Sequence, residues 1–151
     1  MRITAATLLI AVSLLSAATV AGCSGASSRQ FSAVLQFSEE AAQLPMVLSD
    51  ETGLVTGIAS APIDPLADYA EAVARADPTD PNAFIISWLG GACDHDASFT
   101  FKPHEGGYLL HVTVHGNVGF PGGCTMNGIY RDVRIVTSSP IPVDSILIGG
   151  T

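Results

Sequence analysis

Three adjacent side chains with metal-binding or acid–base capacity, Asp94-His95-Asp96, follow directly after Cys93. Carboxylates and imidazoles bind divalent cations and can also transfer protons. The segment lacks the periodic Asp, Asn and Gly spacing of a calcium-binding loop. We therefore expect an ordinary polar turn in a loop, with Asp94, His95 and Asp96 kept as weak candidates for a cation site.

Two other histidines, His111 and His115, share one face of an alternating segment that has the pattern of a strand. Four residues along a strand span about 13 Å, whereas ligand atoms lie within roughly 2–2.6 Å of a bound ion. The two imidazoles cannot easily share one ion, so we expect both at the protein surface. We predict no metal and no cofactor.

The sequence contains none of the short motifs that position a catalytic nucleophile or a nucleotide phosphate. There is no G-x-S-x-G, S-x-x-K, H-E-x-x-H or G-x-x-x-x-G-K-[ST] pattern. Ser87 lies in an apolar segment, and Ser138-Ser139 precedes a proline, without a basic partner close in sequence. We predict no catalytic residues and no enzymatic activity. A hydrolase whose site is assembled only in space stays open as an alternative.

Residues 1–22 have the layout of a secretory signal peptide. Arg2 supplies one positive charge, residues 3–20 carry no charged side chain, and Ala21-Gly22 places small residues before Cys23. A basic start, an apolar core and a small-residue cleavage site are typical of such peptides. The apolar run is also just long enough to span a membrane, but five Ser and Thr residues dilute it.

The motif Val20-Ala21-Gly22-Cys23 resembles the lipobox of bacterial lipoproteins, in which an aliphatic residue and two small residues precede an invariant cysteine. The resemblance implies cleavage after Gly22, diacylglycerol on the Cys23 thiol, and an acyl chain such as palmitate on the new N-terminus. Two or more chains anchor a protein stably, at about 0.8 kcal/mol per buried methylene. The alternative is ordinary secretion with an incidental cysteine.

Cysteine parity is a separate argument. Three cysteines leave an odd thiol in an exported protein. If Cys23 carries lipid, Cys93 and Cys124 form an even pair in a compartment that tolerates disulfides. A bridge between them would close a loop of about thirty residues, worth roughly 3–4 kcal/mol. Free thiols or half a metal site are the alternatives.

The composition is that of one compact, acidic domain of an exported protein. The 151 residues carry six basic and fourteen acidic side chains, and Lys102 is the only lysine. Such a chain lacks the positive charge that binds phosphate backbones, so nucleic-acid binding is excluded. We expect a signal peptide at 1–22, a lipidated cysteine and flexible tether at 23–30, and a single β-rich domain at 31–151.

The first half of that domain predicts a hairpin and one helix. Leu44 to Ala59 places two apolar runs around Asp50-Glu51-Thr52-Gly53, whose glycine suits a left-handed turn position. Asp64 can cap a helix that Pro78 ends. Its packing face would carry residues with the i, i+3, i+4, i+7 spacing: Leu66, Tyr69, Ala70 and Val73.

The second half is strand-like. Phe84 to Leu89 is apolar on both faces, as in a central strand. Residues 98–102 and 108–115 alternate on either side of a glycine-containing turn. If they form a hairpin, their apolar faces coincide only when the numbers of paired residues sum to an odd value. This predicts that Phe99 pairs with Leu110 or with Val112.

Ile129 to Val136 and Ser145 to Ile148 supply the last strands. Arg131 shares a face with Ile129 and Val133 and would point toward the core, so it should pair with an acid unless a bulge turns it outward. Six to eight short strands with one short helix predict a mainly β domain. The expected architecture is a small antiparallel β-sandwich or a curled sheet.

Together these features predict a lipid-anchored binding or scaffolding module at the extracytoplasmic face of the cell membrane. Its partner would be a cell-envelope protein or a small-molecule ligand. The rival functions are an exported hydrolase and a cation-binding module that uses Asp94, His95 and Asp96. The segment from Trp88 to Cys93, with Gly122-Gly123-Cys124 and the strands from Val133 to Ile148, resembles small bacterial lipoproteins of no assigned function.

Overall fold

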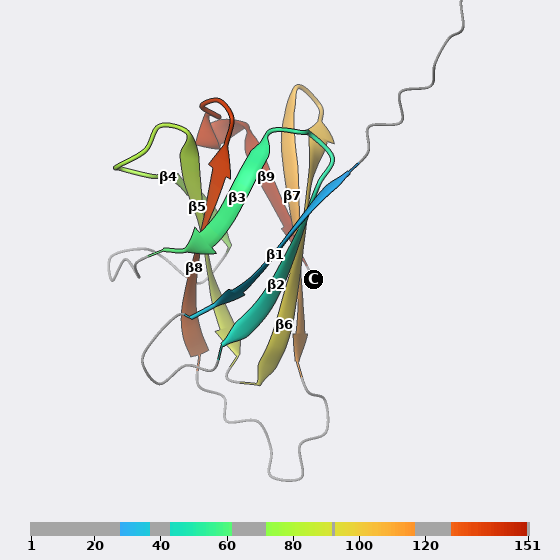
Figure 1. Ribbon diagram of the computed structural model, residues 1–151, viewed down its shortest axis with the longest axis vertical. Helices are drawn as coiled ribbons and strands as arrows, with labels where there is room; N and C mark the ends of the chain where they lie inside the picture. The colour runs from blue at the N-terminus through green and yellow to red at the C-terminus, as the bar shows by residue number, and fades with distance from the viewer. Residues whose placement is uncertain (1–27, 37–42, 62–71, 92, 117–127, 151) are drawn as a thin grey trace, which may run out of the picture.

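The computed structural model describes residues 28–36, 43–61, 72–91, 93–116 and 128–150, which form a mainly β domain. Two sheets lie face to face as a sandwich (Figure 1). The five-stranded sheet has the order β1 (Arg29–Leu35), β2 (Leu44–Asp50), β6 (Asp94–His104), β7 (Gly107–Gly116) and β9 (Ile146–Gly150). The four-stranded sheet has the order β3 (Val55–Ser60), β8 (Gly128–Thr137), β5 (Ala83–Gly91) and β4 (Val73–Ala76).

The predicted mainly β sandwich is confirmed, and most neighbouring strands run antiparallel. Two pairs in the five-stranded sheet, β2 with β6 and β7 with β9, are parallel. The only helical element in the described ranges is the 3-10 turn η1, Val143–Ser145, immediately before β9.

The core lies between the sheets because each strand alternates its side chains between two faces. In β6, Phe99 and Phe101 are buried, whereas the intervening Thr100 is partly exposed. Trp88 of β5 meets Phe99 edge-on, with ring centroids 5.6 Å apart, and Phe84 contacts Phe101 at 5.8 Å. These aromatic contacts join the two sheets, and burying each such side chain contributes about 1.5–3 kcal/mol.

Two predictions about the second half of the chain are confirmed. Phe99 pairs with Val112, one of the two registers with an odd sum. The predicted central strand is β5, which lies between β4 and β8 and is buried over residues 83–88.

The predicted hairpin at Leu44 to Ala59 is wrong, although both of its strands form. β2 pairs with β1 and β6, whereas β3 pairs with β8, so residues 51–54 carry the chain from one sheet to the other. The buried Asp50 carboxylate accepts backbone N–H bonds from Thr52, Gly53 and Val55 and thereby fixes this crossing. Gly53 does take the predicted left-handed conformation, at φ 74°.

The predicted helix is also wrong where it can be compared with the structure. Val73 begins strand β4, which pairs antiparallel with β5 through contacts such as Val73 with Ser87. Pairing with a sheet outweighs local periodicity when a segment lies beside an open strand edge. Residues 64–71 of the predicted helix lie outside the described residues.

The register defines two ends of the sandwich. Arg29 pairs with Asp50, which pairs with Phe101, so the start of β1 lies at the same end as the β6–β7 turn. We call this the Arg29 end. At the opposite end Gly91 pairs with Gly128, and β6 begins there just after Cys93. We call this the Cys93 end.

Candidate functional site

The candidates Asp94, His95 and Asp96 begin strand β6, which corrects the expectation that they form a turn in a loop. The pairing of β6 with β7 shifts by one residue between Asp94 and Asp96. Such a bulge re-aims neighbouring side chains. Asp94 contacts Arg131, whereas His95 and Asp96 lie beside His115. The three candidates therefore divide between two separate groups of contacts.

Arg131 meets an acid, as its place in the strand predicts. The side chain is 2% exposed, and its Nη2 lies 3.4 Å from Asp94 Oδ2 and donates to the Gly91 carbonyl oxygen at 3.0 Å. The Gly91 N–H donates to the same Asp94 oxygen at 2.7 Å. A Cβ at Gly90 would overlap the Arg131 side chain. Burial lowers the pKa of Arg131, and Asp94 opposes this shift.

Asp96 bridges two imidazoles at the Cys93 end. Its Oδ1 lies 2.5 Å from Nδ1 of His115 on β7, and its Oδ2 lies 3.2 Å from Nε2 of His95. The two imidazole rings are 6.4 Å apart between centroids. The three side chains are 42–54% exposed, so solvent reaches them all.

This arrangement is suited to proton transfer. A carboxylate on Nδ1 of a neutral histidine holds the proton there and leaves Nε2 as an acceptor. His115 is positioned in this way by Asp96, while His111 pairs with Thr100 farther along the strand. In the described part of the chain, no group of three or more His, Cys, Asp or Glu side chains is arranged to hold a metal ion.

The predicted covalent sites lie only partly within the described residues. Cys93 immediately precedes β6, whereas Cys124 and Cys23 fall outside the described ranges. The strands on either side of 117–127 nevertheless end beside Cys93, because Asp94 pairs with Gly116 and Gly91 pairs with Gly128.

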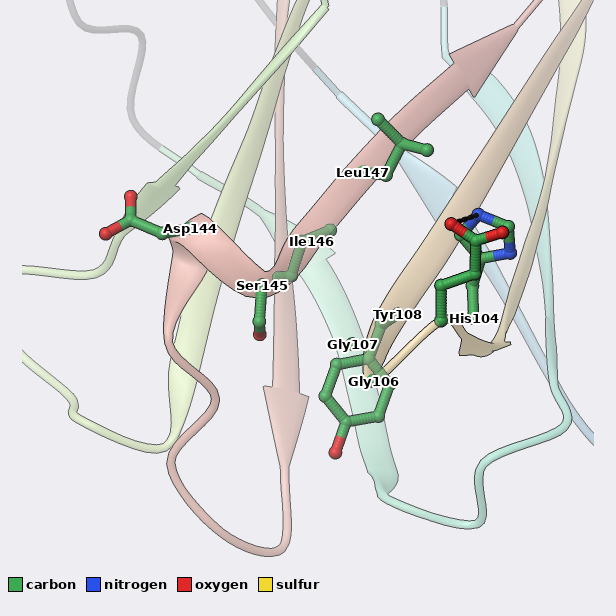
Figure 2. A pocket seen from close by; sticks show the side chains of 9 residues that line it. His104, Gly106, Gly107, Tyr108, Asp144, Ser145, Ile146 and Leu147 are labelled. Carbon is green, nitrogen blue, oxygen red and sulfur yellow. Dashed lines mark ion pairs between the residues drawn. The ribbon is translucent and has the colours of Figure 1, made fainter.

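A shallow pocket of about 350 Å³ lies at the Arg29 end, between the β6–β7 turn and the start of β9. Figure 2 shows Tyr108 and His104 on one side of it and Ser145 and Asp144 on the other. The Tyr108 ring stacks on Phe101 at 5.1 Å, and the Ser145 hydroxyl donates to a backbone carbonyl at 2.6 Å. Asp144 points away from Tyr108 in this view, so the polar groups do not converge.

Sequence reasoning alone does not indicate this pocket, because its two walls are at least 36 residues apart in the chain, from Tyr108 to Asp144. The contact between Asp96 and His115, in contrast, could have been predicted from the sequence. The register that pairs Phe99 with Val112 also pairs Asp96 with His115. Comparing histidines with acids across the hairpin, and not only with each other along one strand, would have found it.

Comparisons with known proteins add no assignment to this geometry. No family model, no curated protein and no solved structure matches the chain. Within the residues that the structure describes, no helix is long and apolar enough to cross a membrane.

Proposed function

We propose that this protein is an exported, lipid-anchored binding module at the extracytoplasmic face of the cell membrane. The observation that carries the proposal is that strand β1 begins at Arg29, six residues after Cys23 of the motif resembling a lipobox. Six residues reach at most about 20 Å when extended. An anchor at Cys23 would therefore hold the Arg29 end against the membrane and direct the Cys93 end away from it.

A disulfide between Cys93 and Cys124 is part of the proposal. Cys124 lies four residues before Gly128, whose pairing partner Gly91 lies two residues before Cys93. In the sequence, each cysteine therefore lies within four residues of this strand pair. A disulfide requires Cα atoms about 4.4–6.8 Å apart. A bridge of this kind would be expected in an oxidising, extracytoplasmic location.

The anchor is tested by intact-protein mass spectrometry and membrane fractionation. The native protein should begin at Cys23 and carry acyl mass, because the thiol is the acceptor that the lipobox resemblance implies. Cys23→Ser should lose the acyl mass and keep residues 1–22. Ser24→Ala, next to the same site, is the matched control and should be processed normally. Cys23→Ser that is still cleaved after Gly22 and equally membrane-bound would contradict the proposal.

An exported hydrolase is the second candidate, and the contact between Asp96 and His115 favours it. The pair provides a general base, and a nucleophile or water would have to lie near Nε2 of His115. Ester hydrolysis by the purified protein that is lost in both His115→Gln and Asp96→Asn would establish this candidate. The cation-binding alternative would require Asp94 to leave Arg131. It predicts a rise in melting temperature with calcium or zinc that Asp94→Ala or His95→Ala removes.

A further inference from the structure

The outer face of the five-stranded sheet carries almost no charge. The outward positions follow from the alternating burial and from the register of the five strands. They are Gln30, Ser32, Val34, Pro45, Val47, Ser49, Asp96, Ser98, Thr100, Lys102, His104, Gly107, Leu109, His111, Thr113, His115, Leu147 and Gly149. Asp96 and Lys102, near opposite ends of β6, are the only Asp, Glu, Lys or Arg among them.

This neutrality contrasts with the rest of the molecule. The chain has a formal net charge of −8, and removal of Arg2 with residues 1–22 makes it −9. On the outer face of the four-stranded sheet, Arg75 lies 3.4 Å from Asp132, and Arg134 bonds to Asp77 and Asp80. The outer face of the five-stranded sheet is therefore close to neutral although the protein as a whole is acidic.

Two rows of mainly small and hydroxyl-bearing side chains cross the middle of this neutral face. One row is Ser32, Val47, Ser98 and Thr113, and the next is Gln30, Ser49, Thr100, His111 and Gly149. Neighbouring members of a row are about 4.8 Å apart, the spacing of strands in a sheet. Five hydroxyl groups, one exposed and four partly exposed, therefore lie on this face without a fixed charge between them.

We propose that this neutral face binds a polysaccharide, namely an uncharged, extended glycan strand of the cell envelope. The inference rests on the proposed function, because it requires an extracytoplasmic location. The chemistry is complementary: sugar hydroxyls exchange hydrogen bonds with the Ser and Thr hydroxyls and the Gln30 amide. The C–H faces of the sugars pack on Val47, Leu109 and Leu147. A neutral polymer also avoids the repulsion that an anionic one would meet on an acidic protein.

A second copy of the chain is the competing occupant of this face, because a two-fold contact would pair Lys102 with Asp96 of another copy. Formation of such a dimer is therefore one outcome of the test.

The test is cosedimentation of the full-length, detergent-solubilised protein with insoluble neutral polysaccharides, using cellulose and chitin as probes. Both hydroxyl rows are interrupted in turn by Ser98→Arg and Thr113→Arg in the first row and by Thr100→Val in the second. Thr56→Arg is the matched control, because Thr56 is exposed on β3 of the other sheet. Thermal melts accompany each variant, so that a loss of binding is scored only in folded protein.

We expect binding that is insensitive to ionic strength, because no charged contact carries it. Each arginine variant should weaken the binding at least about tenfold, because a tenfold loss of affinity corresponds to the loss of one or two hydrogen bonds. Thr100→Val, which keeps the volume and loses the hydroxyl, should weaken it less, and Thr56→Arg should bind normally. No cosedimentation of the wild type, or undiminished binding by the folded arginine variants, would overturn the inference. A dimer that Ser98→Arg dissociates would also overturn it.

Acyl mass at Cys23 is measured on the same preparation, which separates the two proposals. An acylated protein that binds neither polysaccharide would contradict this inference and leave the proposed anchor standing. A protein that binds polysaccharide without acyl mass would contradict the anchor alone.

Discussion

Arg131 occupies a position where strand periodicity would bury an aliphatic side chain, and there it contacts the Asp94 carboxylate and donates to the Gly91 carbonyl oxygen. Breaking a buried ion pair costs more than the pair contributes, because the remaining charge has no partner of opposite sign. Asp94 therefore contributes to stability through its contact with the buried Arg131.

Asp94→Ala should lower the free energy of unfolding by about 3 kcal/mol, because it leaves the Arg131 guanidinium buried without the Asp94 carboxylate. Urea unfolding measures the change. The double variant Asp94→Leu, Arg131→Met should be more stable than Asp94→Ala, since neither charge remains. A loss in Asp94→Ala no larger than in the exposed control Asp144→Ala would contradict this account of the pair.

Asp77 lies in a second polar group, at the end of β4. Its side chain is 4% exposed; Oδ1 accepts from the Thr79 N–H and hydroxyl at 2.7 and 2.6 Å, and Oδ2 accepts from Arg134 Nε at 2.5 Å. The Thr79 hydroxyl, followed by Arg134, lowers the pKa of Asp77 well below its usual value.

This lowered pKa predicts the direction of the acid response. A depressed folded-state pKa gives stability that is complete above the unfolded pKa, about 3.9. That stability is lost as the pH falls from there toward the folded pKa. Asp77→Asn should be less stable at neutral pH and should lose part of the fall in stability below about pH 4. Urea midpoints between neutral and acid pH test this, and an acid response identical to the wild type would contradict it.

At the scale of elements, the sequence was informative where one strand pair could be judged alone. The β6–β7 register follows from the alternation of apolar and polar residues. The burial of Arg131 follows from its place on the same strand face as Ile129 and Val133. The β2–β3 connection could not be predicted in this way. Its two apolar runs fit one hairpin as well as they fit opposite walls of a sandwich, and a single buried carboxylate, Asp50, helps to decide between them.

Strand β4 is a second element that could not be predicted from the sequence. Val73 satisfies a helical spacing with residues before it, yet it pairs with β5 because that strand offers an unsatisfied edge. Such an edge exists only once the sheet has formed. No pattern within residues 64–78 contains this information.

The β6–β7 turn carries backbone strain that a substitution can relieve. Glu105 and Gly106 have φ values of 41° and 84°, and His104 pairs with Gly107 around them. A two-residue turn with positive φ at both positions favours Asn or Gly over Glu at the first. Glu105→Asn should stabilise the protein by about 0.5–1 kcal/mol, whereas Gly106→Ala should destabilise it by about 1 kcal/mol. Thermal melts measure both changes. A change in melting temperature of the same sign for both variants would contradict the turn assignment.

At the scale of the whole molecule, the proposed Cys93–Cys124 bridge would tie the β5–β6 connection to the segment between β7 and β8. Thiol labelling of unreduced, denatured protein should find neither cysteine reactive. Reduction should cost roughly 3–4 kcal/mol of stability. The double variant Cys93→Ala, Cys124→Ala should be insensitive to reductant. Quantitative labelling of both thiols in unreduced protein would rule the bridge out.

The order of strands also determines when the chain can fold. β1 and β9 belong to the same sheet, and the parallel pair β2–β6 joins residues as far apart as Met46 and Ala97. Contacts between distant parts of a chain form slowly, because the loops that separate them must close first. The five-stranded sheet cannot be completed until residues 146–150 have been synthesised. Until then the growing polypeptide lacks a complete five-stranded sheet, and, for the export that we propose, a translocation channel that accepts only unfolded chains could engage it during that time.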